Sequence, residues 1–521
     1  MSGPGNGDRV GPAGDPEQVD AGGSLGSGRS SATGTDSGPR VARRQRTVRP
    51  VAGRTAALAV VVVVLLGVGV VSWVAPPPAA PGAAASGDAS VVAPADAHAA
   101  SFFCATGVGE DAGGGAQESI VLTNSTDSAA VGVASTVYTS GATPATTGVR
   151  VPARGSSVVT PPAGPAGTAS ATRFSFGQGG VTGTAIVSGP QGWSTAPCAT
   201  QVASQWDFAG GSTATGLLDL SLYNPSAAAA MVDVTFLTVG GTVLDPQAYQ
   251  GIALAPGQLV VEGLGAYVQN QSVVATLVEA TSGSLVATEL DDMVVPSGSG
   301  LALLPGVPNP ASTWSFAQTT AVAGGSVTLA VANPGTAPVT AEVTAGLPGA
   351  SVVPHQLVVP GRSVATFAPS ATAGWPLGAP YSLTVTATGP VVVGRTVVAP
   401  AGAAAPQGGI TTGTTSPASS WLVVGPGATG SPAVAGALIH TLAIANRGTA
   451  PVVASVTPLR TGVPVATVRV PAHGVVVIGQ AVLGELQPLT VSASGPVTVE
   501  TDDAPTGAPG VAAFGGFALH G

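Results

Sequence analysis

An internal repeat is the feature of this 521-residue sequence that most constrains its fold. From residue 101 onward, four landmarks recur in one order: an aromatic residue, a strand ending in Asn, a strand ending at Pro, and an apolar strand beginning near Gly. By type, they are Phe103, Trp206, Trp314 and Trp421; Asn124, Asn224, Asn333 and Asn446; Pro152, Pro256, Pro360 and Pro471; and Gly180, Gly283, Gly389 and Gly495. Composition alone does not produce this order, so the sequence predicts a repeated unit of roughly 100 residues.

Each unit has the pattern of an antiparallel β-sandwich. Short runs of alternating apolar and polar residues are separated by turn residues, and about 100 residues is typical of an immunoglobulin-like domain. The Asn at each strand end can hydrogen-bond the backbone of the following turn. We predict an all-β ectodomain of four tandem Ig-like antiparallel β-sandwich repeats, at 101–200, 201–308, 309–416 and 417–521. The alternative is one closed assembly of four quarter-units, such as a propeller with long blades.

The tryptophan and cysteine residues of the repeats have structural interpretations. We expect Trp206, Trp314 and Trp421 to fill the sandwich cores, with ligand stacking as the alternative. Cys104 and Cys198 are the two cysteines of the chain, and they lie near the two ends of the first repeat. A pair outside a membrane predicts a disulfide; the alternative is two unpaired buried thiols.

An uncharged stretch at 56–75 precedes the repeats. As a helix, its twenty residues would rise about 30 Å, the thickness of a bilayer's hydrocarbon core. We predict a disordered cytoplasmic tail at 1–54, a transmembrane helix at 55–75 and an Ala/Pro stalk at 76–100. The positive-inside rule places the N-terminus in the cytoplasm, because arginines crowd the membrane end of the tail: Arg40, Arg43, Arg44, Arg46, Arg49 and Arg54. A cleaved signal peptide is the alternative.

Charge limits the classes of partner. The 16 basic residues are all arginines, and the net charge is −9. Because the part beyond residue 75 is acidic, nucleic acid is an unsuitable partner. Two acidic groups follow the expected last strands of the second and fourth repeats: Glu289, Asp291 and Asp292; and Glu500, Asp502 and Asp503. They either bind Ca²⁺ or form solvated strand ends that block edge-to-edge pairing.

Catalytic motifs are absent from the sequence. None of the five histidines has the spacing of a zinc site, and no repeat carries an acid–base pair in a recognisable setting. We therefore predict no enzymatic activity and no cofactor. Trp375 lies in a loop rich in Gly and Pro, where an exposed ring could stack on a sugar; the alternative is a partly buried loop anchor.

A family resemblance rests on the Arg cluster, the single span, the stalk and several repeat landmarks. The landmarks are Phe103–Cys104, Trp206, Asn224–Pro225, Trp314 and Asn333–Pro334. The chain resembles an uncharacterised family of secreted, membrane-anchored actinobacterial proteins with Val/Gly/Pro-rich β-repeats. The resemblance covers roughly residues 100–521, and Asn446–Arg447 departs from the Asn–Pro pattern. It implies location at the cell envelope and supplies no catalytic residue.

These features together predict a non-enzymatic, single-pass protein of the bacterial cell envelope, with its ectodomain outside the membrane. Its partners would be the lipid bilayer, through residues 56–75, and an envelope protein that it binds or scaffolds. The second hypothesis is a protein that recognises cell-wall glycan through loop aromatics such as Trp375. The third is an envelope hydrolase.

Overall fold

Strands make up almost all regular structure in the computed structural model of this chain. The structure describes residues 100–108, 116–295, 298–402, 408–424, 438–484, 487–505 and 512–519, all within one compact unit, Ser86–Gly521. The predicted tail and transmembrane helix, and the stalk up to residue 99, lie outside these residues. Among the residues described, no helix is both long and apolar enough to cross a bilayer.

The first predicted repeat forms two four-stranded antiparallel sheets with the orders β1-β6-β3-β4 and β5-β2-β7-β8. Its strands are β1 (Ser101–Cys104), β2 (Gln117–Asn124), β3 (Ala130–Tyr138), β4 (Ala145–Val151), β5 (Gly155–Val159), β6 (Ser170–Phe176), β7 (Val181–Gly189) and β8 (Gly192–Pro197). Alternate side chains of a strand point to opposite faces. Ile120 and Leu122 of β2 therefore share one apolar core with Phe102 and Phe174 of the facing sheet.

The second predicted repeat has the same arrangement of two sheets. Their orders are β12-β11-β15-β9, with β13 also paired to β11, and β14-β10-β16-β17. The strands are β9 (Gln205–Asp207), β10 (Leu217–Tyr223), β11 (Ala230–Thr238), β12 (Val243–Leu244), β13 (Ile252–Leu254), β14 (Leu259–Gly263), β15 (Val274–Ser282), β16 (Val286–Val295) and β17 (Gly298–Pro305). The 3₁₀ turns are η1 (Gln247–Tyr249) and η2 (Leu264–Ala266).

In the third and fourth predicted repeats, one long strand takes part in both sheets, β24 and β31 respectively. The third repeat contains β18 (Ala311–Thr319), β19 (Ser326–Asn333), β20 (Val339–Leu347), β21 (Ala350–Ser351), β22 (His355–Val359), β23 (Ser363–Phe367), η3 (Pro369–Ala371), β24 (Tyr381–Val398) and β25 (Gly408–Thr412). The fourth contains β26 (Ala418–Val423), β27 (Leu438–Asn446), β28 (Val452–Pro458), β29 (Ala466–Val470), β30 (Gly474–Gly479), α2 (Gln480–Leu483), β31 (Leu489–Pro505), β32 (Ala512–Gly515) and β33 (Phe517–Ala518).

The Gly landmark lies where the chain passes from one sheet to the other. In β24, pairing with β18 ends at Val391 and pairing with β19 begins at Val392, just after Gly389–Pro390. Proline has no N–H to donate to a ladder, so it favours a change of partner there. Gly180 and Gly283 take the same place before β7 and β16, with left-handed φ angles of 94° and 78°.

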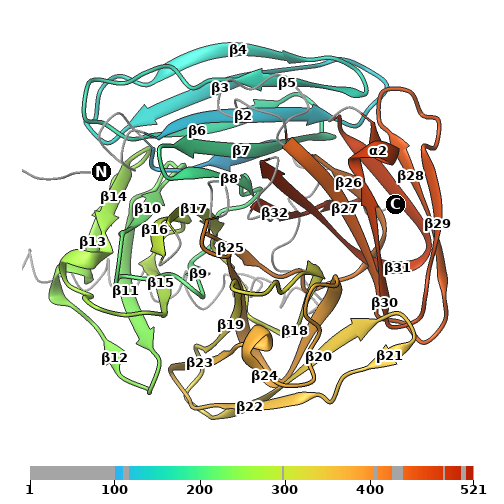
Figure 1. Cartoon of the computed structure of the whole chain (residues 1–521). Coiled ribbons are helices and arrows are strands. Elements are labelled where there is room, and N and C mark those ends of the chain that lie inside the picture. Colours follow the sequence, from blue (N-terminus) through green and yellow to red (C-terminus); the bar gives the residue numbers. More distant parts are fainter. Residues whose placement is uncertain are drawn as a thin grey trace, which may run out of the picture. The chain divides into compact units, whose positions relative to one another are not determined.

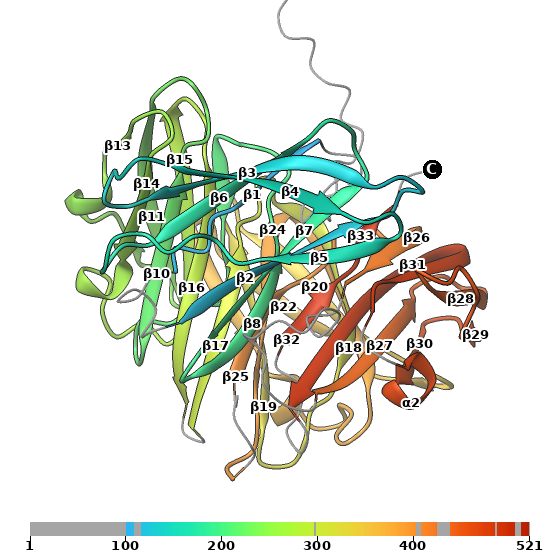
Figure 2. The same ribbon diagram turned by 90° about the horizontal axis from the view of Figure 1, so that it is seen from above.

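One strand from the C-terminal end of each predicted repeat lies against its counterpart in the next, and these contacts form a closed series. β8 packs on β17, β17 on β25, β25 on β32, and β32 on β8; Figure 1 shows the four strands nearest the centre. Leu422 of β26 packs with Val121 of β2 and Ile186 of β7. Figures 1 and 2 both show these first and fourth predicted repeats side by side. The described strands thus form a closed circuit rather than a linear rod.

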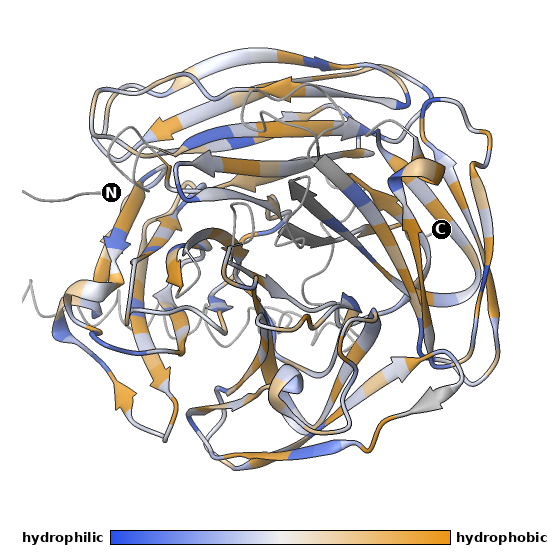
Figure 3. Cartoon of the chain, in the orientation of Figure 1, coloured by the Kyte–Doolittle hydropathy of each residue, from blue (hydrophilic) through white to orange (hydrophobic). Residues whose placement is uncertain are grey.

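Apolar residues explain this closure. Figure 3 shows hydrophobic and hydrophilic residues alternating along many of the strands. One set of apolar residues fills each space between facing sheets, while others, such as Phe103 and Leu422, lie in cores shared with a neighbouring repeat. Burial of both sets removes apolar surface from water, which stabilises each sheet pair and its contact with the next.

Candidate binding site

Each landmark Asn ties a turn to the neighbouring Pro landmark. The four side chains are buried, and each Oδ1 accepts a hydrogen bond of 2.9–3.0 Å from the backbone N–H two residues later. Each Nδ2 donates over 2.7–2.8 Å to the carbonyl four residues later. It also lies 3.1–3.4 Å from two carbonyl oxygens at the Pro landmark. The two landmarks keep a matched spacing because they are in contact.

The landmark tryptophans lie inside the cores. Trp206, Trp314 and Trp421 are 3%, 0% and 0% exposed, so none offers a ring face to a ligand. Their Nε1 groups donate to the carbonyl oxygens two residues after the Gly landmark, those of Leu285, Val391 and Val497, over 2.9, 2.9 and 3.0 Å. Each indole therefore hydrogen-bonds the backbone at the point where the chain passes from one sheet to the other.

Phe102, rather than Phe103, holds the aromatic position of the first predicted repeat. Phe102 lies in the core between the two sheets and stacks on Phe174, with ring centroids 5.0 Å apart. Phe103 points the opposite way, into the core of the second predicted repeat, where it meets Tyr223 edge-on. The prediction of Phe103 as the aromatic landmark is wrong, because spacing in the sequence does not tell which face of a strand is buried.

The predicted disulfide between Cys104 and Cys198 is present, with Cα atoms 4.6 Å apart. Both cysteines are buried in the core of the first predicted repeat. The bridge joins the end of β1 to the residue after β8, so it links the first and last strands of that repeat.

Trp375 is partly buried against the core of the third predicted repeat. Its ring meets Phe367 and Tyr381 edge-on, at centroid distances of 5.0 and 6.4 Å. This geometry matches a loop anchor better than an open sugar-stacking platform.

The acidic groups do not lie at solvated strand ends. Glu289, Asp291 and Asp292 lie within β16 and Glu500 and Asp502 within β31. Glu289 and Asp291 are 1% and 0% exposed; burial raises the pKa of Glu289 to about 7 and that of Asp291 well above its ordinary value. In the part of the chain that the structure describes, no three His, Cys, Asp or Glu residues are placed to hold a metal ion.

The two acidic groups are also not equivalent. Glu289 pairs with Leu220, four residues before its landmark Asn, whereas Glu500 pairs with Ala443, three residues before its own. A shift of one residue turns a side chain to the opposite face of a strand. Glu289 therefore points between its own sheets, while Glu500 points toward the third predicted repeat.

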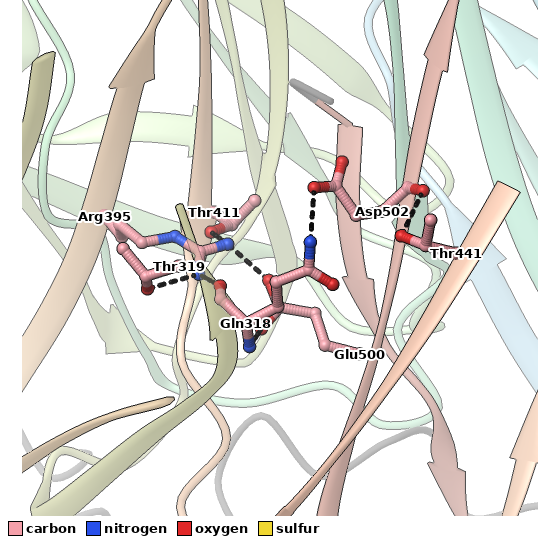
Figure 4. A network of polar contacts seen from close by, with 7 residues as sticks. All are labelled: Gln318, Thr319, Arg395, Thr411, Thr441, Glu500 and Asp502. Carbon is pink, nitrogen blue, oxygen red and sulfur yellow. Dashed lines mark hydrogen bonds and ion pairs between the residues drawn. The ribbon is translucent and has the colours of Figure 1, made fainter. Parts of the chain in front are cut away.

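Glu500 forms a buried ion pair with Arg395 of β24 (Figure 4). The Arg395 guanidinium also donates to the Gln318 carbonyl and to the hydroxyl groups of Thr319 and Thr411. The backbone N–H of Gln318 donates to Glu500 over 3.1 Å. The pair links two predicted repeats, and sequence reasoning missed it because its partners are 105 residues apart.

A cavity of about 390 Å³ lies at one end of the first predicted repeat. Pairing between β2 and β5 stops at Ile120 and Val159, so the preceding residues of β2 have no strand beside them on that edge. The loop 160–168 forms one wall of the cavity. The Tyr138 hydroxyl holds this loop by donating to the Pro162 carbonyl over 3.1 Å, and three prolines limit its backbone freedom.

Glu118 is the only ionisable side chain among the residues that line this cavity. It is 7% exposed, and burial raises its pKa to about 8. The nearby hydroxyl groups of Thr106 and Ser170 lower this pKa, but by less than burial raises it. Neither carboxyl oxygen has a hydrogen-bond partner of normal geometry among the described residues. A buried polar group without a partner is costly, so this one is a candidate for contact with a ligand.

Two features of the sequence mark this site. Glu118 precedes Ile120 and Leu122 at the alternate positions of the strand that face the core, and the nearby loop carries Pro161, Pro162 and Pro165. Neither feature fits a strand or loop that serves only to fill a core.

Comparisons with known proteins identify no family. No protein-family model matches the chain, and no curated protein sequence matches it. Among solved structures, the chain is similar to "Crystal structure of tetra-tandem repeat in extending region of large adhesion protein", at 12% identity over 76% of this chain and 93% of that chain, with a TM-score of 0.11. A TM-score this low carries no conclusion about fold or function.

Proposed function

We propose that this protein is a non-enzymatic binding or scaffold protein of the bacterial cell envelope. A helix at 55–75 anchors it in the membrane with the N-terminus in the cytoplasm, as in the actinobacterial family that it resembles. Four Ig-like sandwich repeats form the ectodomain outside the membrane and bind an envelope partner. The disulfide between Cys104 and Cys198 supports an extracytoplasmic location, because disulfides persist in oxidising compartments.

The observation that carries a binding function is the cavity beside Glu118. Its volume of about 390 Å³ falls in the range of small-molecule sites, roughly 300–1,000 Å³. Its lining combines apolar atoms with a buried carboxyl group, and small-molecule binding sites commonly combine apolar walls with a few polar groups. The residues that line it include no histidine or cysteine, and Glu118 is the one carboxyl group among them.

Topology is tested in cells that express the full chain with a tag at each end. External protease added to intact protoplasts should remove the C-terminal tag and leave the N-terminal tag intact. Protection of both tags would overturn the proposed location. Binding is tested with the full chain in lipid nanodiscs, mixed with envelope proteins and, separately, with purified cell wall; recovery of a specific envelope protein is the expected outcome.

Cell-wall glycan recognition through Trp375 is the second candidate. Because this ring packs on Phe367 and Tyr381, we expect Trp375→Ala to lower the stability of the full chain by about 1–3 kcal/mol. Retention on cell wall should not change. Loss of cell-wall binding with unchanged stability would instead favour the glycan function.

A further inference from the structure

The first predicted repeat departs from the second and third at the position of Glu118. This residue lies six positions before the landmark Asn, and the residues at the same offset in the other repeats are Leu218, Val327 and His440. All three are buried, and the leucine and valine belong to the cores of their repeats. The fold therefore accepts an apolar side chain here, and a carboxyl group is not needed to form it.

The end of the core beside this position is also built differently. In the other three repeats, a short helical turn follows the corresponding strand and packs on the equivalent of β2: η2 on β10, η3 on β19, and α2 on β27. These turns bury Leu264, Pro369 and Leu483. In the first repeat the loop 160–168 has no helical turn, and the cavity lies there instead.

No cation of the described residues neutralises Glu118. The first predicted repeat contains three arginines: Arg150 is exposed, Arg154 pairs with Asp127, and Arg173 lies over the Phe103 ring. The sequence between Val108 and Ala116 has no basic residue, so it cannot supply one either. Asp291 of the second repeat, also buried, accepts a hydrogen bond from the Ser212 N–H over 3.0 Å. The buried Glu289 likewise has no hydrogen-bond partner among the described residues, but it does not line this cavity.

We propose that the cavity binds an organic cation, whose primary ammonium or guanidinium group pairs with the carboxylate of Glu118 while its apolar body contacts the prolines of loop 160–168. Both carboxyl oxygens are covered in this structure, so the Glu118 side chain turns into the cavity when the cation binds. This inference rests on the proposed binding function and names the chemical class of ligand. The cation belongs either to a free amine or to a Lys or Arg side chain of an envelope partner. An external cation supplies the charge that the cavity lacks, and pairing in a partly dry site is stronger than in water.

The test uses the full chain in nanodiscs and two kinds of probe. Cadaverine represents a free amine, and a blocked Gly-Lys-Gly peptide represents a protein side chain. Pentan-1-ol and the matching norleucine peptide are uncharged controls. Isothermal titration at pH 8 should show binding of one cation per chain, at least tenfold tighter than its uncharged control, and the tighter of the two cations identifies the source.

Two variants at one position separate recognition from folding. Glu118→Gln keeps the shape, and Glu118→Leu introduces the side chain that the second repeat carries as Leu218, so the fold tolerates it. Both should lose at least tenfold in affinity for the cation. Glu289→Gln, a buried control outside this cavity, should bind as the unchanged protein does. Unchanged affinity in both Glu118 variants would overturn the proposal.

The pH dependence supplies a readout that a structural role would not produce. The burial that raises the pKa of Glu118 to about 8 keeps the carboxyl group protonated at pH 6, whereas an alkylamine stays charged up to a pH of about 10. Affinity should therefore rise up to roughly tenfold per pH unit between pH 6 and 8, with release of a proton on binding.

Negative results remain distinguishable. Equal binding of pentan-1-ol and cadaverine, or no heat of binding for either cation at concentrations up to several millimolar, would overturn the cation site. If an envelope protein is still recovered by the Glu118→Leu variant, the proposed function stands without this ligand class. If neither the probes nor any envelope component binds, both proposals fail.

Discussion

Glu118, Asp207 and Glu289 are carboxyl groups held in apolar surroundings, each less than a tenth exposed. Burial raises their pKa values to about 8, 7 and 7 respectively. In the unfolded chain the same groups titrate near pH 4. Between these values the folded protein holds protons that the unfolded chain has released, so the stability of the fold depends on pH.

The stability of the full chain should fall as pH rises from about 5 to 8. A raised carboxyl pKa favours the folded state when the group is protonated, and this advantage is lost as the pH passes above the unfolded value and toward the folded one. Glu289→Gln removes one of these groups, so the free energy of unfolding that is lost between pH 5 and pH 8 should be smaller by on the order of 2–3 kcal/mol. Denaturant unfolding at several pH values measures it. The exposed Glu342→Gln variant is the control, and equal slopes in both variants would contradict the prediction.

The landmark asparagines act as single residues with several partners. Asn333→Ala removes the acceptor of the Gly335 N–H and the donor to Ala337 and Pro360, leaving buried polar groups unpaired. We expect a loss of about 3 kcal/mol in the free energy of unfolding. Chemical denaturation provides the measurement, with the exposed Asn309→Ala as control; similar losses in the two variants would argue against the role of the asparagine.

At the scale of elements, the passage from one sheet to the other determines how each predicted repeat is built. The chain changes its pairing partner at a Gly landmark. In the last three predicted repeats, the indole N–H of the landmark tryptophan hydrogen-bonds the backbone at this point. In β24 and β31 the strand continues through the change, because a Gly–Pro pair bends it without a loop.

Gly283 should be sensitive to a methyl group for two reasons. Its φ is 78°, and an added Cβ would lie 2.7 Å from the Ala229 carbonyl oxygen. Gly257 has a similar φ of 74° but no atom within 4 Å of such a Cβ. We expect Gly257→Ala to cost about 1–2 kcal/mol from backbone strain alone and Gly283→Ala to cost about 1–2 kcal/mol more, from crowding. Unfolding of the two variants measures the difference, and equal costs would show that crowding is relieved.

At the scale of the whole described structure, closure depends on apolar contacts and on one buried ion pair. Arg395 and Glu500 have side chains only 2% and 6% exposed, and they join the third and fourth predicted repeats. Arg395 also lies over the Phe316 ring, 4.9 Å from its centroid. A buried pair is often no more stable than an apolar substitute, but a buried charge that loses its partner is strongly destabilising.

A double-mutant cycle should show this coupling. Arg395→Met and Glu500→Leu alone should each cost about 3–5 kcal/mol, while the double variant should recover at least about 2 kcal/mol of the summed loss. Equilibrium unfolding of the full chain measures all four states. Strict additivity would mean that the two side chains do not stabilise the closure as a pair.

Local pattern in the sequence was sufficient for the fold class and several contacts. Alternation of apolar and polar residues predicts strands because a strand presents successive side chains to opposite faces, and the described structure is all-β with antiparallel sheets. The disulfide followed from the only two cysteines of the chain. The landmarks mark strand ends and turns because Asn, Pro and Gly each have local backbone preferences.

Only the tertiary structure decided which face of each strand meets which neighbour. Phe103 and Glu500 point away from the core of their own predicted repeat and toward an adjacent one. A one-residue shift in the pairing of a strand is enough to reverse such a direction. The closed circuit of strands and the empty end of the first core depend on contacts between residues far apart in the sequence. Local periodicity therefore determined that this chain forms sheets, whereas packing between distant segments determined where a buried carboxyl group is left without a partner.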